Sequence, residues 1–382
     1  WNEFNVVVFD EDYEYFYLNG DYQLGGDNGE ITGEPDIDLY PGSGLIIEGN
    51  KMLQKGNIHY ISNADAYPSI IADGNLSMDT LRIVFPQHQG VWHFLTFPFD
   101  IKRQDIQCNG EFVVRYYDGA IRAANGSGGW QNVPSDELHN GQGYIFQTAD
   151  NDTLVLEFPS PILPNEDVSL PLYLYDAANA WDANWNMVGN PYLSYYDMDS
   201  ISDFFYPIIA WNGTGYDTYR PGDDVYHFKP LEGFFIQNAN LSQVTLPISG
   251  RETRTEANTK LADSHSLRKV MAAAPAEKEA RKLINLTLSS ATYTDRTRVV
   301  FNANASLEYE IGVDANKFIS SSAPVQLYSL GKNNEQYSIN ERPDTRAGEM
   351  IQLGYYAATA GTFTLSASRM DTAIVIYDYV MN

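Results

Sequence analysis

The sequence has a single cysteine, Cys108, in 382 residues. One thiol forms no intramolecular disulfide, and neither CxxC nor a His/Cys zinc pattern occurs. The six histidines show no HExxH or HxH spacing, and no GxSxG motif marks a serine nucleophile. Adjacent carboxylates such as Asp136-Glu137 and Asp223-Asp224 point to opposite faces of a strand, whereas a glycosidase needs two that face each other. We therefore predict no catalytic residue and do not expect an enzyme.

Long apolar runs are also absent. No stretch approaches 18 uninterrupted apolar residues, so we predict no transmembrane segment, and no signal peptide is recognisable. The sequence begins at Trp1 and ends at Asn382 within strand-like patterns. We expect it to be part of a longer chain.

Basic residues are scarce, with 24 Lys and Arg against 50 Asp and Glu and a net charge of −26. Residues 1–250 hold 9 basic and 35 acidic residues, a net of −26, whereas residues 251–382 hold 15 of each. A negative field of this size repels phosphate, so we predict no nucleic-acid partner. It favours cations, or simply keeps the surface soluble.

Tyrosine, glycine and proline are abundant, with 27, 29 and 18 copies. Aromatic residues favour strands, and Gly and Pro punctuate short strands with turns. We therefore predict an all-β fold of tandem β-sandwich or jelly-roll-like modules. Short apolar runs at regular spacing in the first 85 residues predict a β-solenoid-like segment or an edge sheet.

An internal duplication organises the middle of the chain. Trp92 matches Trp185 at an offset of 93, Gly119 matches Gly213 at 94, and Gly143 matches Gly233 at 90. In each copy the Trp opens an apolar run that ends at Pro, a turn-type Asp-Gly or Asn-Gly follows, and a later Gly precedes an aromatic run. The two copies could form separate sandwiches or two halves of one.

These patterns predict five segments. Residues 1–85 are the solenoid-like or edge strands, which we expect to pack on the next module. Residues 86–160 and 161–250 are the two repeat units. Residues 251–282 are a polar linker that could be partly helical, and residues 283–382 are a C-terminal β-sandwich.

The runs that begin at Pro41, Ile58, Pro68, Trp92 and Trp185 resemble large surface proteins of Bacteroidetes. The last module, with Ile311 to Lys317 and Leu327 to Leu330, is similar to the β domain near their C-termini. The resemblance implies export across the outer membrane, often by a type IX-like route, and display at the cell surface. Members of that group are mostly adhesins, scaffolds or uncharacterised proteins, so the resemblance supplies no catalytic residue.

Acidic loops near the start of the chain offer hard oxygen ligands among glycine turns. The candidate ligands are Asp21, Asp27, Asp36 and Asp38, although they lack EF-hand spacing. We predict no organic cofactor, and structural calcium at these residues is the metal that the sequence suggests. Loop carboxylates without metal are the alternative.

Aromatic residues gather around the second repeat's hairpin, where Trp211, Tyr216 and Tyr219 are candidate ligand-binding residues. Exposed rings can stack on sugars or anchor a protein, whereas an ordinary β core is the alternative interpretation.

The leading functional hypothesis is a non-catalytic extracellular or cell-surface module for adhesion or structural scaffolding, with a host or cell-surface protein or glycan as partner. The alternative is a carbohydrate-binding module of a glycan-processing surface protein, and a glycoside hydrolase is a third hypothesis. The sequence identifies neither the ligand nor the oligomeric state.

Overall fold

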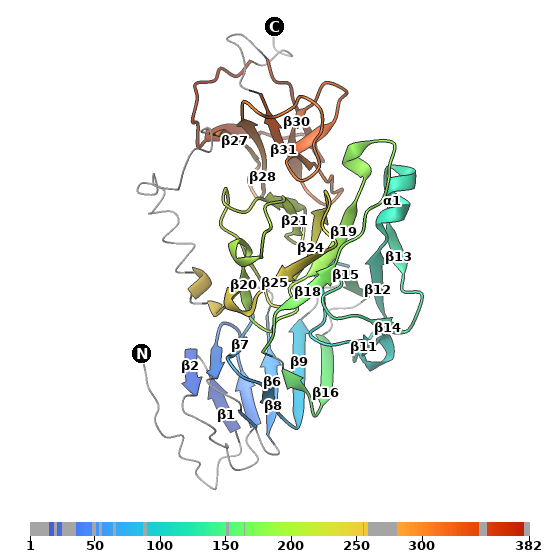
Figure 1. Cartoon of the computed structure of the whole chain (residues 1–382), viewed down its shortest axis with the longest axis vertical. Coiled ribbons are helices and arrows are strands. Elements are labelled where there is room, and N and C mark those ends of the chain that lie inside the picture. Colours follow the sequence, from blue (N-terminus) through green and yellow to red (C-terminus); the bar gives the residue numbers. More distant parts are fainter. Residues whose placement is uncertain are drawn as a thin grey trace.

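The computed structural model describes residues 15–18, 21–24, 36–47, 51–52, 56–63, 66–86, 90–149, 153–163, 165–254, 256–258, 281–343 and 350–377. The fold is all-β, as predicted, with α1 (Gly119–Asn125) as a short helix. The elements follow one long axis, with the N-terminal strands at one end, the two repeat units in the middle and the C-terminal module at the other end (Figure 1).

The N-terminal strands pair in parallel, which is the arrangement of a β-solenoid and not of a simple edge sheet. β1 (Tyr15–Leu18), β3 (Asp36–Leu39), β6 (Asn57–Ile61) and β9 (Thr80–Pro86) form one face. A second face holds β2 (Asp21–Leu24), β4 (Gly44–Ile47) and β7 (Ser69–Ala72), and a third holds β5 (Lys51–Met52) and β8 (Leu76–Ser77).

Alternate side chains of these strands point inward and stack from one coil to the next. Leu39, Tyr60 and Ile83 occupy one such row and are fully buried. Antiparallel strands from the repeat units close two of the faces. β16 (Thr153–Pro159), of the first unit, pairs with β9, and β17 (Ile162–Leu163), at the start of the second, pairs with β8. β9 therefore belongs to the solenoid and to the repeat unit at once, and the predicted boundary at residues 85/86 cuts through this strand.

The two repeat units have the same strand order. The first forms a four-stranded sheet of β10 (His93–Leu95), β15 (Tyr144–Thr148), β12 (Phe112–Tyr117) and β13 (Trp130–Asn132). The second forms β19 (Trp185–Gly189), β24 (Gly233–Gln237), β21 (Ile208–Trp211) and β22 (Tyr216–Tyr219). In both, the order along the sheet is first, last, second and third, and every neighbouring pair is antiparallel.

The smaller strand pairs also correspond between the units. β11 (Ile101–Lys102) pairs with β14 (Glu137–Leu138), as β20 (Tyr195–Asp197) pairs with β23 (His227–Phe228). The pair of β18 (Val168–Pro171) with β25 (Gln243–Leu246) matches the pair of β9 with β16. β26 (Arg251–Glu252) adds to β20, so the first two residues of the predicted linker belong to a sheet of the second unit.

One predicted turn differs between the copies. Asn212 and Gly213 make the expected tight turn, with Gly213 at a φ of +93°. Asp118-Gly119, by contrast, begins helix α1, because the Asp118 side chain accepts a hydrogen bond from the Ala120 N–H and caps the helix. The first hairpin therefore contains a helical insertion between β12 and β13.

The C-terminal module is a curled sheet. Its strand order is β32 (Leu353–Ala357), β30 (Val325–Leu330), β31 (Gln336–Arg342), β28 (Thr294–Phe301), β27 (Lys282–Ser289) and β33 (Thr364–Ser368), and β29 (Ala315–Asn316) adds to β31. β28 and β31 are parallel, and the other neighbouring pairs are antiparallel. Leu286, Val299 and Val325 lie in its buried core.

Candidate functional site

The two repeat units meet through reciprocal backbone hydrogen bonds. The Thr96 N–H donates to the Leu231 carbonyl at 2.9 Å, and the Gly189 N–H donates to the Gly141 carbonyl at 2.8 Å. Gly189 follows Thr96 by 93 residues and Leu231 follows Gly141 by 90, which are the offsets of the sequence repeat. Each unit therefore gives the other the same contact that it receives, as at a two-fold symmetric dimer interface.

Glycines allow this close approach. A Cβ atom on Gly143 would lie 2.4 Å from Cγ of Met187, and one on Gly189 would lie 2.6 Å from Cβ of Thr96. Gly143, the glycine that precedes the aromatic run in the first copy, thus allows the second unit to come near.

The facing sheets of the two units share an aromatic core, so they are halves of one structure. Trp185 and Phe235 of the second unit are buried against Ile145 of the first, and Phe318 of the C-terminal module completes the cluster. Phe94 lies with its ring centroid 5.5 Å from that of Phe235. Such edge-to-face pairs stabilise a core beyond the burial of their area.

Trp211 and Tyr216, two of the predicted ligand-binding residues, are half-buried in this cluster. The Trp211 indole stacks on Phe94 at 5.8 Å and donates from Nε1 to the Trp92 carbonyl at 2.8 Å. The Tyr216 ring lies 4.9 Å from Trp211, and burial raises the pKa of the Tyr216 hydroxyl to about 12. Both rings thus pack against other aromatic side chains of the protein, and the Trp211 N–H bonds within it.

Tyr219, the third predicted residue, lies outside this cluster. Its ring stacks on Tyr226 with centroids 4.1 Å apart, and Arg296 of the C-terminal module lies over it at 5.8 Å. Burial raises its hydroxyl pKa well above the ordinary value. The structure therefore brings Trp211 and Tyr216 together and places Tyr219 at a different contact.

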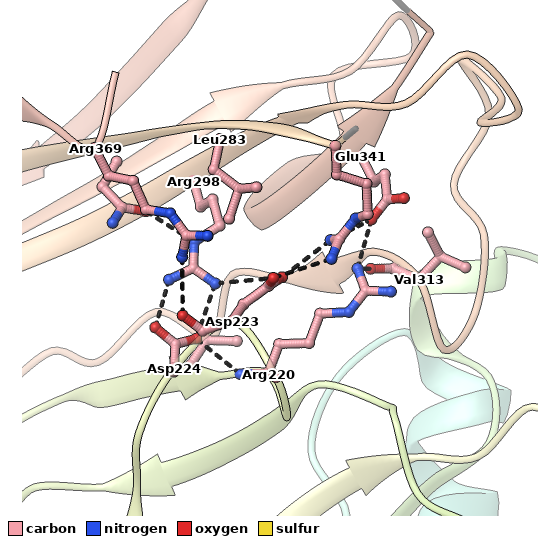
Figure 2. A network of polar contacts seen from close by, with 12 residues as sticks. Arg220, Asp223, Asp224, Leu283, Arg298, Val313, Glu341 and Arg369 are labelled. Atoms are coloured by element: carbon pink, nitrogen blue, oxygen red, sulfur yellow. Dashed lines mark hydrogen bonds and ion pairs between the residues drawn. The ribbon is translucent and has the colours of Figure 1, made fainter. Parts of the chain in front are cut away.

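A buried network of charges joins the second unit to the C-terminal module (Figure 2). Arg298 is 1% exposed and donates from both terminal nitrogens to the Asp224 carboxylate, with Nη1 to Oδ2 at 2.8 Å. Arg296 reaches the same carboxylate at 3.1 Å. Arg281 bridges Asp223, at 3.0 Å, to Glu341, at 2.8 Å.

Each of the two modules supplies both arginine donors and carboxylate acceptors to this network. Arg220 of the second unit donates to Glu341 of the C-terminal module at 2.5 Å and to the Val313 carbonyl at 3.2 Å. Asp223 and Asp224, which the sequence offered as an adjacent carboxylate pair, thus serve as acceptors for arginines of the next module. A buried charge needs such a partner, because an unpaired one costs several kcal/mol.

The electrostatics of the carboxylates differ by partner. Burial alone would raise the pKa of Asp224, but the bonds from Arg298 and the charges of Arg296 and Arg298 hold it below its usual range. The pKa of Glu341 is likewise lowered against the effect of burial, by Arg220, Asn302 and Arg281.

Asp314, close to this network, behaves in the opposite way. It is 2% exposed and accepts hydrogen bonds from the backbone N–H groups of Glu310 and Glu341, both at 2.8 Å. Burial raises its pKa to about 7, and the neighbouring charges of Glu341 and Glu310 add to the increase. Asp314 therefore gains a proton near neutral pH.

The candidate calcium ligands are partly described. Asp36 accepts from Asn57 at 2.6 Å, and Asp38 pairs with Nδ1 of His59 at 2.7 Å, each across neighbouring parallel strands. Asp21 lies in β2 but its side chain, like all of Asp27, is outside the described residues. In the part of the chain that the structure describes, no group of three His, Cys, Asp or Glu side chains could hold a metal ion.

A buried His–Glu pair was not expected from the sequence. His227 on β23 and Glu252 on β26 flank β20, and Nδ1 of His227 lies 2.9 Å from the Glu252 carboxylate. The two residues are 25 positions apart in the chain and carry no motif.

Comparisons with protein-family models, with curated proteins and with solved structures found no match. None of the helices in the described segments is long and apolar enough to cross a membrane.

Proposed function

We propose that this chain is a non-catalytic cell-surface or secreted module that serves adhesion or structural scaffolding. The observation that supports the proposal is the continuity of the modules. The solenoid shares β9 with the first unit, and the two units form reciprocal backbone hydrogen bonds. The ion pair of Arg298 with Asp224 joins the C-terminal module to the second unit. Such a body can hold a binding surface at a fixed distance from an attachment point.

The charge distribution fits an extracellular role. The negative residues of positions 1–250 keep the exposed length of the molecule soluble and disfavour polyanions. The partner in this proposal is a host or cell-surface protein or glycan. The resemblance to Bacteroidetes surface proteins supports display at the outer cell surface, with export by a type IX-like route, as part of this proposal.

An array of host matrix proteins and glycans, probed with the purified chain with and without calcium, tests the proposal. We expect saturable binding to one or more proteins and no change in the chemical structure of any ligand. Hydrolysis of a glycan on the array would contradict the non-catalytic assignment. Binding that requires calcium would favour Asp36 and Asp38 as ligands.

Carbohydrate binding is the second candidate, and one specific observation favours it. Tyr173 is 57% exposed, and its ring lies 6.4 Å from that of Tyr175, two positions along the same extended segment. Two neighbouring rings at the surface can contact the apolar face of a sugar. Under this candidate Tyr173→Ala abolishes glycan binding, whereas a substitution at Trp211 acts through the core.

A further inference from the structure

A turn of the C-terminal module docks on the second repeat unit through Tyr309 and Gly312. The Tyr309 hydroxyl donates to Oε1 of Gln237 at 2.5 Å. Gly312, with a φ of +84°, lies so close to the unit that an added Cβ would be 3.0 Å from the Tyr206 ring and 3.5 Å from Ala239. The second unit therefore contacts this Tyr-x-x-Gly turn at the tyrosine hydroxyl and at the glycine, which has no side chain.

The first unit has residues at the corresponding positions, because the two sheets pair in the same register. Val114 pairs with Phe146 in the first unit, as Ile208 pairs with Ile236 in the second, at offsets of 94 and 90. By these offsets, the residues that touch the turn, Tyr206, Gln237 and Ala239, correspond to Phe112, Gln147 and Ala149.

All three corresponding residues line a pocket of about 460 Å³ on the first unit. Arg103 closes one side, with its guanidinium 5.0 Å from the Phe112 ring centroid. Thr148 also lines the pocket and is 1% exposed, and its Oγ1 has no hydrogen-bond partner among the described residues.

The counterpart of Thr148 in the second unit is satisfied locally. Asn238 donates to the Leu241 carbonyl at 2.7 Å and accepts from the Leu241 N–H at 2.8 Å. A buried hydroxyl without a partner costs free energy, so the first unit carries at Thr148 an unsatisfied polar group whose counterpart in the second unit is satisfied.

We propose that this pocket is a docking site for a glycine-bearing turn of a partner protein, of the Tyr-x-x-Gly form that residues 309–312 present to the second unit. In such a complex the partner's tyrosine hydroxyl donates to Gln147, and its glycine lies flat on Phe112 and Ala149. The chain's own turn is already engaged on the second unit, so the occupant belongs to another molecule. The inference goes beyond adhesion in general and does not depend on where the chain is located.

The probe is a cyclised peptide with the sequence of residues 307–314, fluorine-labelled and titrated with the full chain by NMR. We expect saturable binding, because the matching site on the second unit is occupied and the pocket is open. Ala149→Trp fills the pocket from an exposed position and should weaken binding by about tenfold or more. Ala124→Trp, the same change on the exposed side of α1, should leave binding unchanged.

A peptide with leucine in place of its glycine should bind as weakly as the normal peptide binds to the Ala149→Trp variant. Val113→Arg, at a pocket residue that is 39% exposed, gives a second blocking variant should Ala149→Trp unfold. The proposal is overturned by a peptide that shows no saturable binding up to about 10 mM. It is also overturned by equal binding to the two tryptophan variants, or by a glycan that occupies the pocket in preference to the peptide.

Discussion

Arg298 and Asp224 lie 74 residues apart in the sequence and form a buried, bidentate ion pair between two modules. The guanidinium comes from β28 of the C-terminal module and the carboxylate from a turn of the second repeat unit (Figure 2). Planar, bidentate geometry of this kind is what arginine provides and lysine does not. The pair therefore determines the orientation of one module on the other as well as their attachment.

Replacing Arg298 with methionine should destabilise the protein by about 3 to 5 kcal/mol, because Asp224 then stays buried with only part of its neutralising charge. Urea unfolding followed by fluorescence and by hydrogen exchange at the module interface measures the loss. The double variant Arg298→Met with Asp224→Leu should recover part of it, since no unpaired charge remains.

An Arg298→Met variant as stable as Lys332→Met would contradict this account. Lys332 is the matched control, because it pairs with Glu308 at the surface, where both side chains are more than half exposed.

Asp314 gives the protein a pH dependence of opposite sign to that of its neighbours. Its folded pKa, about 7, is above the unfolded value of 3.8, so the folded state keeps a proton that the unfolded state loses. Its contribution to stability is complete below about pH 4 and is lost as the pH rises toward 7.

Asp314→Asn should remove this contribution. The stability of the variant relative to the unmodified protein should therefore improve between pH 4 and pH 8, by at most about 1.4 kcal/mol per unit of pKa shift. Urea midpoints at several pH values measure it. A relative stability that does not change with pH would show that Asp314 has an ordinary pKa.

The sequence predicted the all-β class because its signals are local. An apolar run that ends at Pro191 and a glycine before an aromatic run, as at Gly233, can be recognised from a few neighbouring residues. The repeat predicted two units of the same kind, but not the way the units pair. Their reciprocal bonds join backbone atoms of Thr96, Leu231, Gly189 and Gly141, and backbone atoms carry no residue-specific signal.

The charge network could not be predicted from the sequence for a different reason. Asp223-Asp224 is visible as a carboxylate pair, but nothing in the sequence selects its partners among the basic residues of the chain. A partial signal was present at Arg298, which lies directly before the apolar run Val299 to Phe301 in a strand that is buried along most of its length. A charge within such a strand indicates a buried partner.

Trp211→Ala separates the two interpretations of the aromatic cluster. The Trp211 ring contacts Phe94 and Tyr216 and bonds to the Trp92 carbonyl, so its loss should cost about 2 to 4 kcal/mol, somewhat less than for a fully buried tryptophan. Thermal unfolding measures this cost, and glycan binding by the folded variant should be unchanged. A variant of normal stability that had lost a sugar ligand would restore Trp211 as a binding residue.

Gly189→Ala tests the reciprocal junction directly. The new Cβ would lie 2.6 Å from both Cβ and Cγ2 of Thr96 and 3.0 Å from the Glu232 carbonyl oxygen, where backbone atoms cannot move aside easily. Overpacking of this kind should destabilise the protein by about 1 to 3 kcal/mol and speed hydrogen exchange at the Thr96 N–H, which bonds across the junction.

Gly361→Ala is the matched control, because its Cβ would meet only Phe363, at 3.6 Å. Adding Thr96→Gly to Gly189→Ala removes two of the clashing atoms and should restore part of the stability. Equal stability of the Gly189 and Gly361 variants would mean that the two units are held together by the aromatic core and not by the close approach of their backbones.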